Sequence, residues 1–322
     1  MIDVRRLNVL KAVVETGSVA AAAELLSYTP SAVSQQMSTL ERETGVRLLE
    51  RVGRGVRPTE VALLLCEHTS RVLAAVQDAE DALAAWRSGR TGRLRLAAFP
   101  TASSALVPGA LADFRSQLPD VALDFVVAEP DEATSHLRAG SVDVAVVVLP
   151  RSPGEPVNDG LVHHHLLADP FRAVLPRSHP LAAKRQLDIA LAAGEPWIGV
   201  SSCPDLCALV VELACARAGF RPRYALEADE YPTALGFIAA GLGVALVPLM
   251  ALSPSPHPGV AVRRVKGIQP ERQVWALTRD AIADELPVRA MIACLKRAAD
   301  EFVTEVVGPV PGRVPELATG TG

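Results

Sequence analysis

The segment TPSAVSQQMSTLERET, residues 29–44, decides the fold of the N-terminal region. Thr29 is a residue type that caps helix N-termini, and Pro30 suits the first helical position, where its missing N–H costs nothing. Three apolar residues recur at helical spacing and predict a buried face: Val33, Met37 and Leu40. The segment is therefore expected to be a helix that begins at Pro30 and buries one side.

A second face of the same helix is polar but carries no charge. It is formed by Ser31, Ser34, Gln35 and Ser38. A solvated helix face usually carries Lys and Glu, whereas short uncharged donors and acceptors suit contact with base edges in the major groove of DNA. The pattern favours a helix that reads DNA, and an ordinary solvated face is the alternative.

Two shorter helical segments precede this one. Residues 4–15 carry one apolar stripe, Gly17 offers a left-handed stop and Ser18 a cap, and an alanine-rich segment, residues 19–26, follows. Small side chains allow the close helix approach of a helix-turn-helix. The three segments together predict that motif.

A wing is expected after the third helix. Gly53-Arg54-Gly55 is typical of the tip of a two-stranded ribbon, with Val52 and Val56 in its arms. The surrounding segment, from Arg42 to Arg57, is rich in arginine. Arg51 and Arg54 are therefore expected to reach phosphates or a narrow minor groove, and a basic surface loop is the alternative.

These runs resemble the LysR-type transcriptional regulators, almost continuously over residues 5–63. The resemblance rests on AAAELL (21–26), PSAVSQQM (30–37), LE (40–41), GVRLLER (45–51) and RPT (57–59). It implies DNA contacts by Ser31, Ser34 and Gln35. The family usually has Gln where Pro30 stands, so the contact expected at Pro30 differs here, and it commonly has Phe where Leu49 stands. The resulting set of DNA-contacting candidates is Pro30, Ser31, Ser34, Gln35, Ser38, Arg51 and Arg54.

Residues 59–87 contain neither Pro nor Gly and predict one long helix of about 40 Å. Apolar residues at alternating spacings of three and four form a heptad-like seam, and the dimerisation candidates on it are Leu65, Val72, Val76, Leu83 and Trp86. Packing against the C-terminal domain of the same chain is the alternative. The resemblance implies antiparallel pairing of two such helices, hence a homodimer, or a dimer of dimers.

Beyond Arg93, apolar strands alternate with helices, which predicts an α/β domain with a largely parallel sheet. LLADP (166–170), LPRSHPLA (175–182) and AGLGVALVP (240–248) resemble the effector domain of the same family, which is similar to two-lobed periplasmic solute-binding proteins. The overall fold class is α+β multi-domain. The expected domains are 1–58 (winged helix-turn-helix), 59–91 (linker and dimerisation helix), 92–303 (effector binding, with lobe I about 92–163 and 267–303 and lobe II about 164–266) and 304–322 (a disordered tail).

Two strand-to-helix turns are candidates for contacts with a small-molecule effector. They supply Thr101, Ala102 and Ser103 from one lobe, and Ser202 and Cys203 from the other. Hydroxyls and free backbone N–H groups at a helix start can hold an anion. Plain N-capping is the alternative for both turns.

Other motifs give weaker indications of function. His163-His164-His165 cannot converge on a metal, because neighbouring residues of a strand point to opposite faces. Of the five cysteines, Cys203 and Cys207 leave a thiol redox sensor as an alternative. No nucleophile elbow, P-loop or zincin motif occurs, so neither an enzyme nor a bound cofactor other than the effector is expected.

The net charge of −4 argues against binding polyanions by bulk attraction, yet it is compatible with a specific DNA reader. Neither a signal-peptide core nor a membrane-spanning run occurs, which predicts a cytoplasmic protein. The family resemblance implies a bacterial protein associated with the nucleoid. The expected function is effector-controlled transcriptional regulation. Its partners are double-stranded operator DNA, a second copy, a small-molecule co-inducer and RNA polymerase. A solute-binding or transport component is the other alternative.

Overall fold

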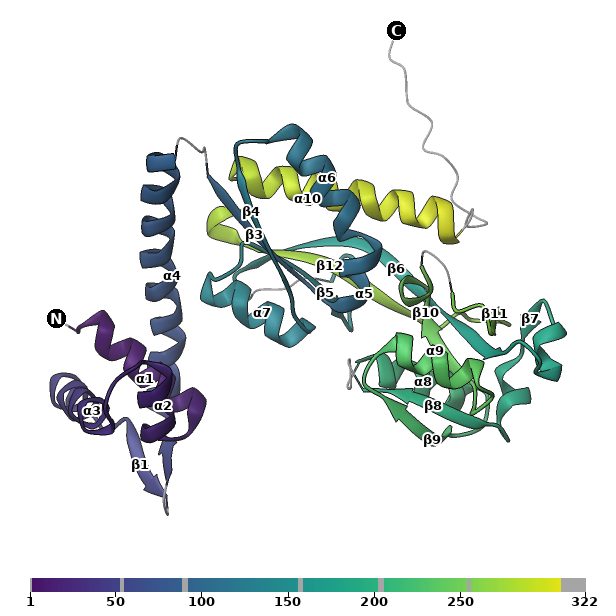
Figure 1. Cartoon of the computed structure of the whole chain (residues 1–322), viewed down its shortest axis with the longest axis horizontal. Coiled ribbons are helices and arrows are strands. Elements are labelled where there is room, and N and C mark those ends of the chain that lie inside the picture. The colour runs from purple at the N-terminus through teal and green to yellow at the C-terminus, as the bar shows by residue number, and fades with distance from the viewer. Residues whose placement is uncertain are drawn as a thin grey trace, which may run out of the picture. The chain divides into compact units, whose positions relative to one another are not determined.

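The computed structural model describes residues 2–52, 55–88, 92–155, 159–201, 206–253 and 256–307 (Figure 1). Its contacts divide the chain into two compact units, Met1–Arg93 with Ser135–Val142, and Leu94–Thr134 with Asp143–Gly322. Each unit is described by itself. Within the described residues, no helix is both long enough and apolar enough to span a membrane.

The N-terminal unit contains the predicted winged helix-turn-helix. Its elements are α1 (Val4–Thr16), α2 (Val19–Leu25), α3 (Pro30–Thr44), β1 (Leu49–Val52), β2 (Gly55–Pro58) and α4 (Glu60–Ser88). Gly17 and Gly45, both left-handed, end α1 and α3, while the hydroxyls of Ser18 and Thr29 cap α2 and α3. Local sequence signals thus set the helix ends, as predicted.

The first three helices share a small apolar core. Leu10, Val13, Val33 and Leu40 are completely buried in it. The antiparallel wing follows, with Leu49 opposite Pro58 and Val52 opposite Gly55. The expected two-stranded wing is therefore present, and its predicted tip, residues 53–54, lies outside the described residues.

A mixed sheet forms the frame of the C-terminal unit, in the order β4-β3-β5-β12-β6-β11-β7, with β10 also paired to β6. The strands are β3 (Arg93–Ala98), β4 (Ala122–Val127), β5 (Val144–Leu149), β6 (Leu161–Pro176), β7 (Gln186–Leu187), β10 (Ala245–Pro248), β11 (Val260–Val265) and β12 (Glu271–Arg279). A separate parallel pair is formed by β8 (Pro196–Val200) and β9 (Arg223–Ala228).

The prediction of a largely parallel sheet is wrong. The long strand β6 is antiparallel to β12, β10 and β11, and β12 is antiparallel to β5 as well. An apolar run predicts a buried strand, but it does not encode the direction of its neighbours, which depends on the path of the whole chain.

Strand β6 passes through both lobes of the unit. Its first part, Leu161–Pro170, pairs with β12, and its second part, Phe171–Pro176, pairs with β10 and β11. We call lobe I the part built on β3, β4, β5, β12 and the first part of β6. Lobe II is the part built on β8, β9, β10, β11 and the second part of β6.

Helices complete each lobe. Those of lobe I are α5 (Pro100–Ala105), α6 (Val107–Gln117) and α10 (Leu286–Phe302), and those of lobe II are α8 (Leu206–Arg217) and α9 (Tyr231–Ala239). Helix α7 (Pro130–Ala139) begins in lobe I, and its residues from Ser135 onward are grouped with the N-terminal unit. Short 3₁₀ segments lie at Pro180–Ala183, Ile189–Ala192, Leu249–Leu252 and Asp280–Ile282. Helices α6 and α10 lie side by side (Figure 1).

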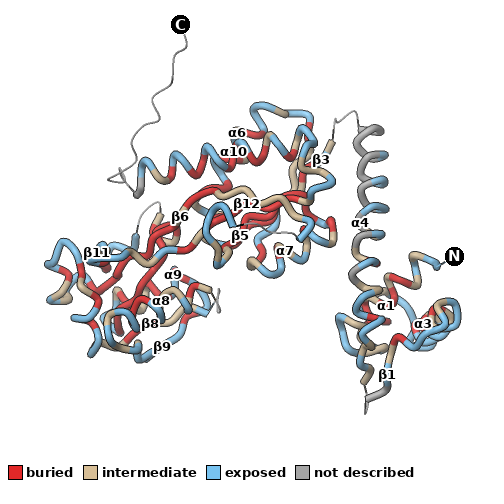
Figure 2. The backbone as a smooth tube through the Cα atoms, turned by 180° about the vertical axis from the view of Figure 1, so that it is seen from behind, coloured by how far each residue is buried: buried red, intermediate tan, exposed pale blue. Residues whose placement is uncertain are grey.

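The burial pattern of α10 is that of an amphipathic surface helix. Val288, Met291, Leu295 and Phe302 face the core at helical spacing, and the buried and exposed positions alternate along the helix in Figure 2. A π-helical turn, Val303–Val307, continues α10. The predicted tail, 304–322, therefore begins too early, because helical backbone extends to 307; residues 308–322 lie outside the described residues.

Candidate functional site

Helix α3 separates its two faces as the sequence predicts. Val33, Met37 and Leu40 are buried, whereas the candidate contact residues are exposed: Pro30, Ser31, Ser34, Gln35 and Ser38. The Thr29 hydroxyl accepts a hydrogen bond from the Ala32 N–H at 3.2 Å and lies 3.0 Å from the Ser31 hydroxyl. The uncharged face is thus open to a macromolecular partner.

Charged side chains attach α3 to the neighbouring parts of the N-terminal unit. Arg6 donates from Nε to the Gln36 amide oxygen at 3.1 Å and forms an ion pair of 2.5 Å with Glu43. One oxygen of Glu41 accepts from the backbone N–H groups of Leu48 (2.8 Å) and Leu49 (3.2 Å). Glu41 therefore joins α3 to the start of the wing, a role that its sequence position alone did not reveal.

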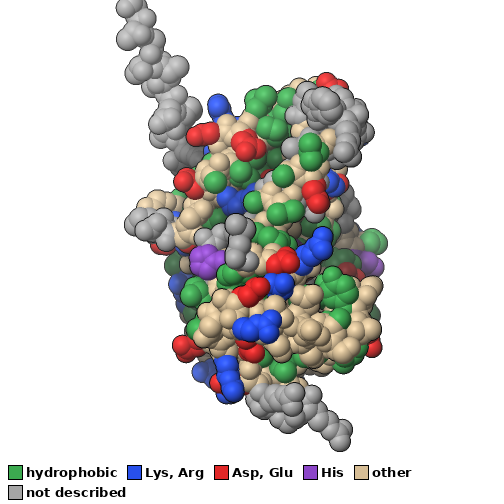
Figure 3. Space-filling view, turned by 90° about the vertical axis from the view of Figure 1, so that its left-hand side faces the viewer, with side chains coloured by type: hydrophobic (Ala, Val, Ile, Leu, Met, Phe, Trp, Pro, Cys, Tyr) green, Lys and Arg blue, Asp and Glu red, His purple; other side chains and the backbone are tan. Residues whose placement is uncertain are grey.

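The wing arginines are only partly described. Arg51 belongs to β1, but its side chain lies outside the described residues, and Arg54 lies outside them altogether. Arg57 forms an exposed ion pair of 2.8 Å with Glu50 across the two strands. Among the side chains coloured in Figure 3, Lys and Arg lie interspersed with Asp and Glu.

Helix α4 exposes part of the predicted seam. Val72, Val76 and Leu83 are 39%, 43% and 58% exposed in the single chain. Leu65 instead packs partly against the core of its own winged helix, because the first turns of α4 lie on that core. Three further apolar residues of α4 are exposed as well, by 45%, 49% and 56%: Val61, Leu63 and Leu64. The side chain of Trp86 lies outside the described residues.

A large cavity of about 760 Å³ opens between lobe I and lobe II. It begins where β3 runs into α5, and the residues that follow β9, together with the start of α9, form its other wall. The lining residues are Phe99, Pro100, Thr101, Ser104, Glu129, Asp229, Glu230, Tyr231, Pro232, Thr233, Ala251, Ser253 and Arg272. We call this cavity the cleft.

A buried ion pair forms the floor of the cleft. Arg272 on β12 donates from Nε to Asp169 on β6 at 3.0 Å, and its Nη2 lies 3.0 Å from the same carboxylate oxygen. Nη2 also donates to the Thr101 hydroxyl at 2.7 Å, and Nη1 donates to the Cys207 sulfur at 3.4 Å. The guanidinium lies over the Phe99 ring, 5.0 Å from its centre. Arg272 thus links lobe I, lobe II and the cleft.

The environment of the floor shifts several pKa values. Burial lowers the pKa of Arg272, but the Asp169 carboxylate and Cys207 raise it more, so the net pKa lies above its ordinary value. For Glu129 in the cleft wall, burial raises the pKa first, with Cys207 adding to it and Arg272 opposing it. The Arg272 guanidinium is therefore charged, and it partly offsets the rise in the pKa of Glu129, which forms no salt bridge among the described residues.

The effector candidates occupy different positions. Thr101 lines the cleft, Ala102 is completely buried beneath it, and Ser103 donates its hydroxyl to the carbonyls of Ala98 (3.1 Å) and Phe99 (2.9 Å). Ser202 and Cys203 lie outside the described residues. Contacts of these five residues with an effector stay predictions. Arg272 and Asp169 were not among the predicted site residues, although an acid inside the apolar run 166–175 is a signal of a buried partner.

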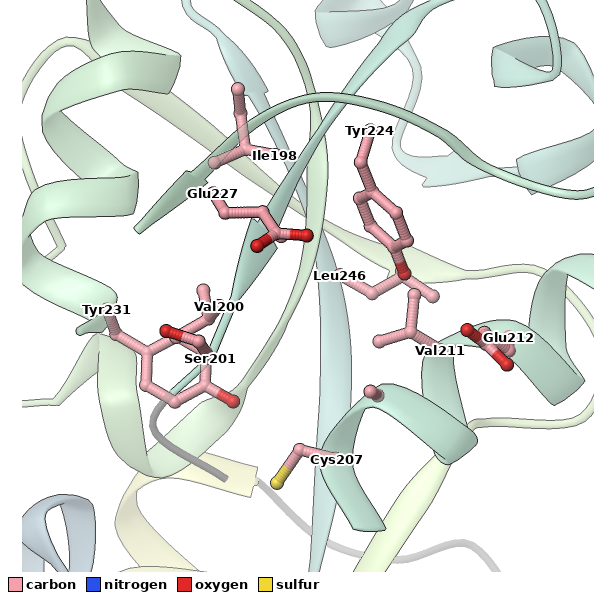
Figure 4. Close-up of a pocket in the computed structure, with 12 residues that line it drawn as sticks. Ile198, Val200, Ser201, Cys207, Val211, Glu212, Tyr224, Glu227, Tyr231 and Leu246 are labelled. Carbon is pink, nitrogen blue, oxygen red and sulfur yellow. The ribbon is translucent and has the colours of Figure 1, made fainter. Parts of the chain in front are cut away.

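A second, smaller cavity of about 240 Å³ lies within lobe II (Figure 4). Figure 4 shows Cys207 and Tyr231 on one side of it and Glu227 and Tyr224 on the other. Tyr231 also lines the cleft. Burial, followed by Glu212, Cys215 and Glu227, raises the pKa of Tyr224 to about 12.

Two side chains of the histidine run, those of His163 and His165, make contacts with neighbouring side chains of the protein. Nε2 of His163 lies 3.1 Å from Asp159, and Nε2 of His165 lies 2.8 Å from Gln273. Both rings contact Trp275 edge-on. No group of three or more His, Cys, Asp or Glu able to hold a metal occurs among the described residues.

Two family models match the chain. Residues 4–63 match the bacterial regulatory helix-turn-helix protein, lysR family, and residues 87–300 match the LysR substrate binding domain. The chain belongs to the LysR family. This regulator is 30% identical over 300 residues to the probable HTH-type transcriptional regulator LrrA of Synechococcus elongatus, a match covering 93% of this chain and 98% of that protein.

Further relatives agree. The transcriptional activator protein LysR of Escherichia coli is 29% identical over 264 residues, 82% of this chain and 83% of that protein. The crystal structure of CbnR, a LysR family transcriptional regulator, has a TM-score of 0.64 at 23% identity and covers 92% of this chain and 99% of that one. Full-length CbnR complexed with its target DNA gives a TM-score of 0.63, also at 23% identity, with coverage of 92% and 100%. These structures share the fold.

The family assignment gives the general function. The regulator is a LysR-type transcriptional regulator, with a DNA-binding helix-turn-helix followed by an effector-binding domain, and it is not an enzyme.

Proposed function

We propose that α3 reads an operator through its uncharged face, with Ser31, Ser34, Gln35 and Ser38 at base edges and Pro30 at the start of the contact. The observation that carries this proposal is that all five side chains are exposed while the apolar face of the same helix is buried. Serine and glutamine can exchange hydrogen bonds with bases in the major groove. Arg51 and Arg54 of the wing would add contacts to the phosphate backbone.

A second copy of the chain is proposed to cover α4. Val72, Val76 and Leu83 form an exposed apolar stripe, which needs a partner to remove it from water. An antiparallel homodimer would present two α3 helices to a two-fold symmetric operator, and two dimers could bind together as a tetramer.

Control by a small-molecule co-inducer is proposed to act through the cleft, where Thr101, Ala102, Ser103, Ser202 and Cys203 are the original contact candidates. The cavity of about 760 Å³ has the size of a small-molecule site. Because the lobes share β6, a ligand that bridges them would change their relative orientation and hence the operator spacing that the assembly fits. RNA polymerase at the promoter, in the bacterial nucleoid, would be the target of that change.

The test begins with genome-wide mapping of binding sites, which supplies operator DNA for anisotropy titrations. A Ser34→Ala/Gln35→Ala variant should lose discrimination between operator and random DNA, whereas Arg54→Ala should weaken both more evenly and flatten the salt dependence. Ser178→Ala, which replaces an exposed serine of the C-terminal domain, is the control. Unchanged discrimination in the double variant would refute the assignment of α3.

A further inference from the structure

The cleft is lined by three carboxylates from opposite lobes. Glu129 follows β4 in lobe I, whereas Asp229 and Glu230 follow β9 in lobe II. Within the described part of the chain, no lysine or arginine forms a salt bridge with any of the three. Asp229 accepts only from the Ser201 hydroxyl, and Glu230 from the Thr233 hydroxyl, both at 3.4 Å, among those residues. The two walls of the cleft therefore carry the same charge.

The positive charge of the cleft is already compensated. Arg272 is the one lysine or arginine among the described lining residues, and its side chain is 1% exposed. Asp169 lies 3.0 Å away and is fully buried, so this pair adds no net charge. The remaining charge of the lining is that of Glu129, Asp229 and Glu230. An anionic ligand would meet three carboxylates and one arginine that is already paired.

A role in stabilising helix N-termini explains only part of this arrangement of three carboxylates. Asp229 and Glu230 precede α9, and acids are favourable at helix N-termini. However, Glu230 occupies the cap position without making a side-chain cap hydrogen bond. Glu129 likewise directly precedes α7. Helix dipoles thus account for each acid separately, but not for their convergence on one cavity from two lobes.

We propose that the effector of this regulator is an organic cation, with an ammonium or guanidinium group held between Glu129 of lobe I and Asp229 or Glu230 of lobe II. This inference rests on the proposed role of the cleft as the effector site. The hydroxyls of Thr101, Ser104 and Thr233 supply further hydrogen-bond partners, and Phe99 and Pro232 supply an apolar wall. A cation attracted by both walls offsets their mutual repulsion and draws the lobes together, whereas an anion would not.

The test is calorimetric titration of the full-length protein, at fixed ionic strength, with probes that share one carbon skeleton and differ in the charge of their terminal groups. One series is 2-phenylethylamine, 2-phenylethanol and 3-phenylpropanoate, and the other is butane-1,4-diamine, butane-1,4-diol and hexanedioate. We expect the amines to bind more tightly than the matched alcohols and carboxylates. Glu129→Gln and Glu230→Gln should each weaken amine binding by roughly tenfold or more. Asp120→Asn, an exposed acid outside the cleft, should leave it unchanged.

Tighter binding of the carboxylates, absence of amine binding, or equal amine affinity in wild type and the glutamine variants would overturn the proposal. Thermal unfolding confirms that each variant folds, and Asp229→Asn replaces any that does not. The affinity of the protein for operator DNA is then measured in the presence of each probe. This measurement distinguishes failure of the cationic class from failure of the cleft as the effector site. Amines that bind in the cleft without changing operator affinity or footprint would refute the effector role, whereas carboxylates that bind there and change it would refute only the cationic class.

Discussion

Replacing Asp169 by alanine should be among the most destabilising single changes in the effector-binding domain. Its carboxylate accepts from Arg272 Nε at 3.0 Å and from the Met250 N–H at 3.1 Å. Both partners are buried, the side chain of Asp169 completely. The substitution leaves a guanidinium without its counter-charge and a backbone N–H without its acceptor. Breaking a buried pair by removing one partner costs about 3–5 kcal/mol.

For a domain of roughly 150–250 residues, each kcal/mol corresponds to about 2–4 °C in Tm, so the expected decrease is of the order of 10 °C. Urea and thermal unfolding, followed by the fluorescence of Trp197 and Trp275, would measure it. Asp113→Ala, which removes an exposed ion pair with Arg297, is the control and should change stability far less.

Removing both charges of the pair should have a much smaller effect. An Asp169→Leu/Arg272→Met variant should lie within about 1–2 kcal/mol of wild type, because the desolvation cost of the pair disappears together with its attraction. A loss below about 1 kcal/mol in Asp169→Ala, or a double variant as unstable as the single one, would refute the assignment of a strongly coupled buried pair.

Four further changes test other parts of the structure. Glu41→Ala removes the acceptor of two backbone N–H groups, so it should lower the free energy of unfolding by about 1–3 kcal/mol and weaken operator binding. Glu41→Gln keeps an acceptor oxygen and should partly restore both. Equal stability of wild type and the two variants would contradict this role of Glu41. Glu129→Gln should make the free energy of unfolding less dependent on pH. The pKa of Glu129 is raised in the folded state, so its ionisation costs stability as pH rises from about 4.5 through the folded pKa. Urea midpoints measured over a pH series would contradict this if their slope with pH were the same in the variant as in wild type. Gly243→Ala places a Cβ 2.6 Å from the Pro196 carbonyl oxygen and should lower the free energy of unfolding by about 1–3 kcal/mol. Gly236→Ala, which has open space around its position in α9, should leave stability unchanged or raise it in the same unfolding assay. Val72→Glu/Val76→Glu should shift the sedimentation of the protein toward the monomer, and an exposed Ala216→Glu control should not; an unchanged oligomer would place the dimer interface elsewhere.

The sequence alone was sufficient for the winged helix-turn-helix. Thr29, Pro30, Gly17 and Gly45 act on backbone groups within a few residues of themselves, so helix ends can be inferred without knowing the rest of the fold. The exposed and buried faces of α3 follow from helical periodicity in the same way. The apolar strands β3, β5 and β10 were also predicted, because burial on both faces leaves a continuous apolar run.

Only the tertiary structure decided the direction of those strands and the composition of the cleft. The pair of Asp169 and Arg272 joins residues 103 positions apart, and the bond from Arg272 to Thr101 spans 171. Glu129 and Glu230 likewise line one cavity from different lobes. Such contacts depend on how the chain returns through β6 and β12, and no local pattern records that path. The sequence by itself therefore determined that this protein reads DNA, because that module is built from local signals, whereas the charge that its effector meets emerges only when distant segments fold together.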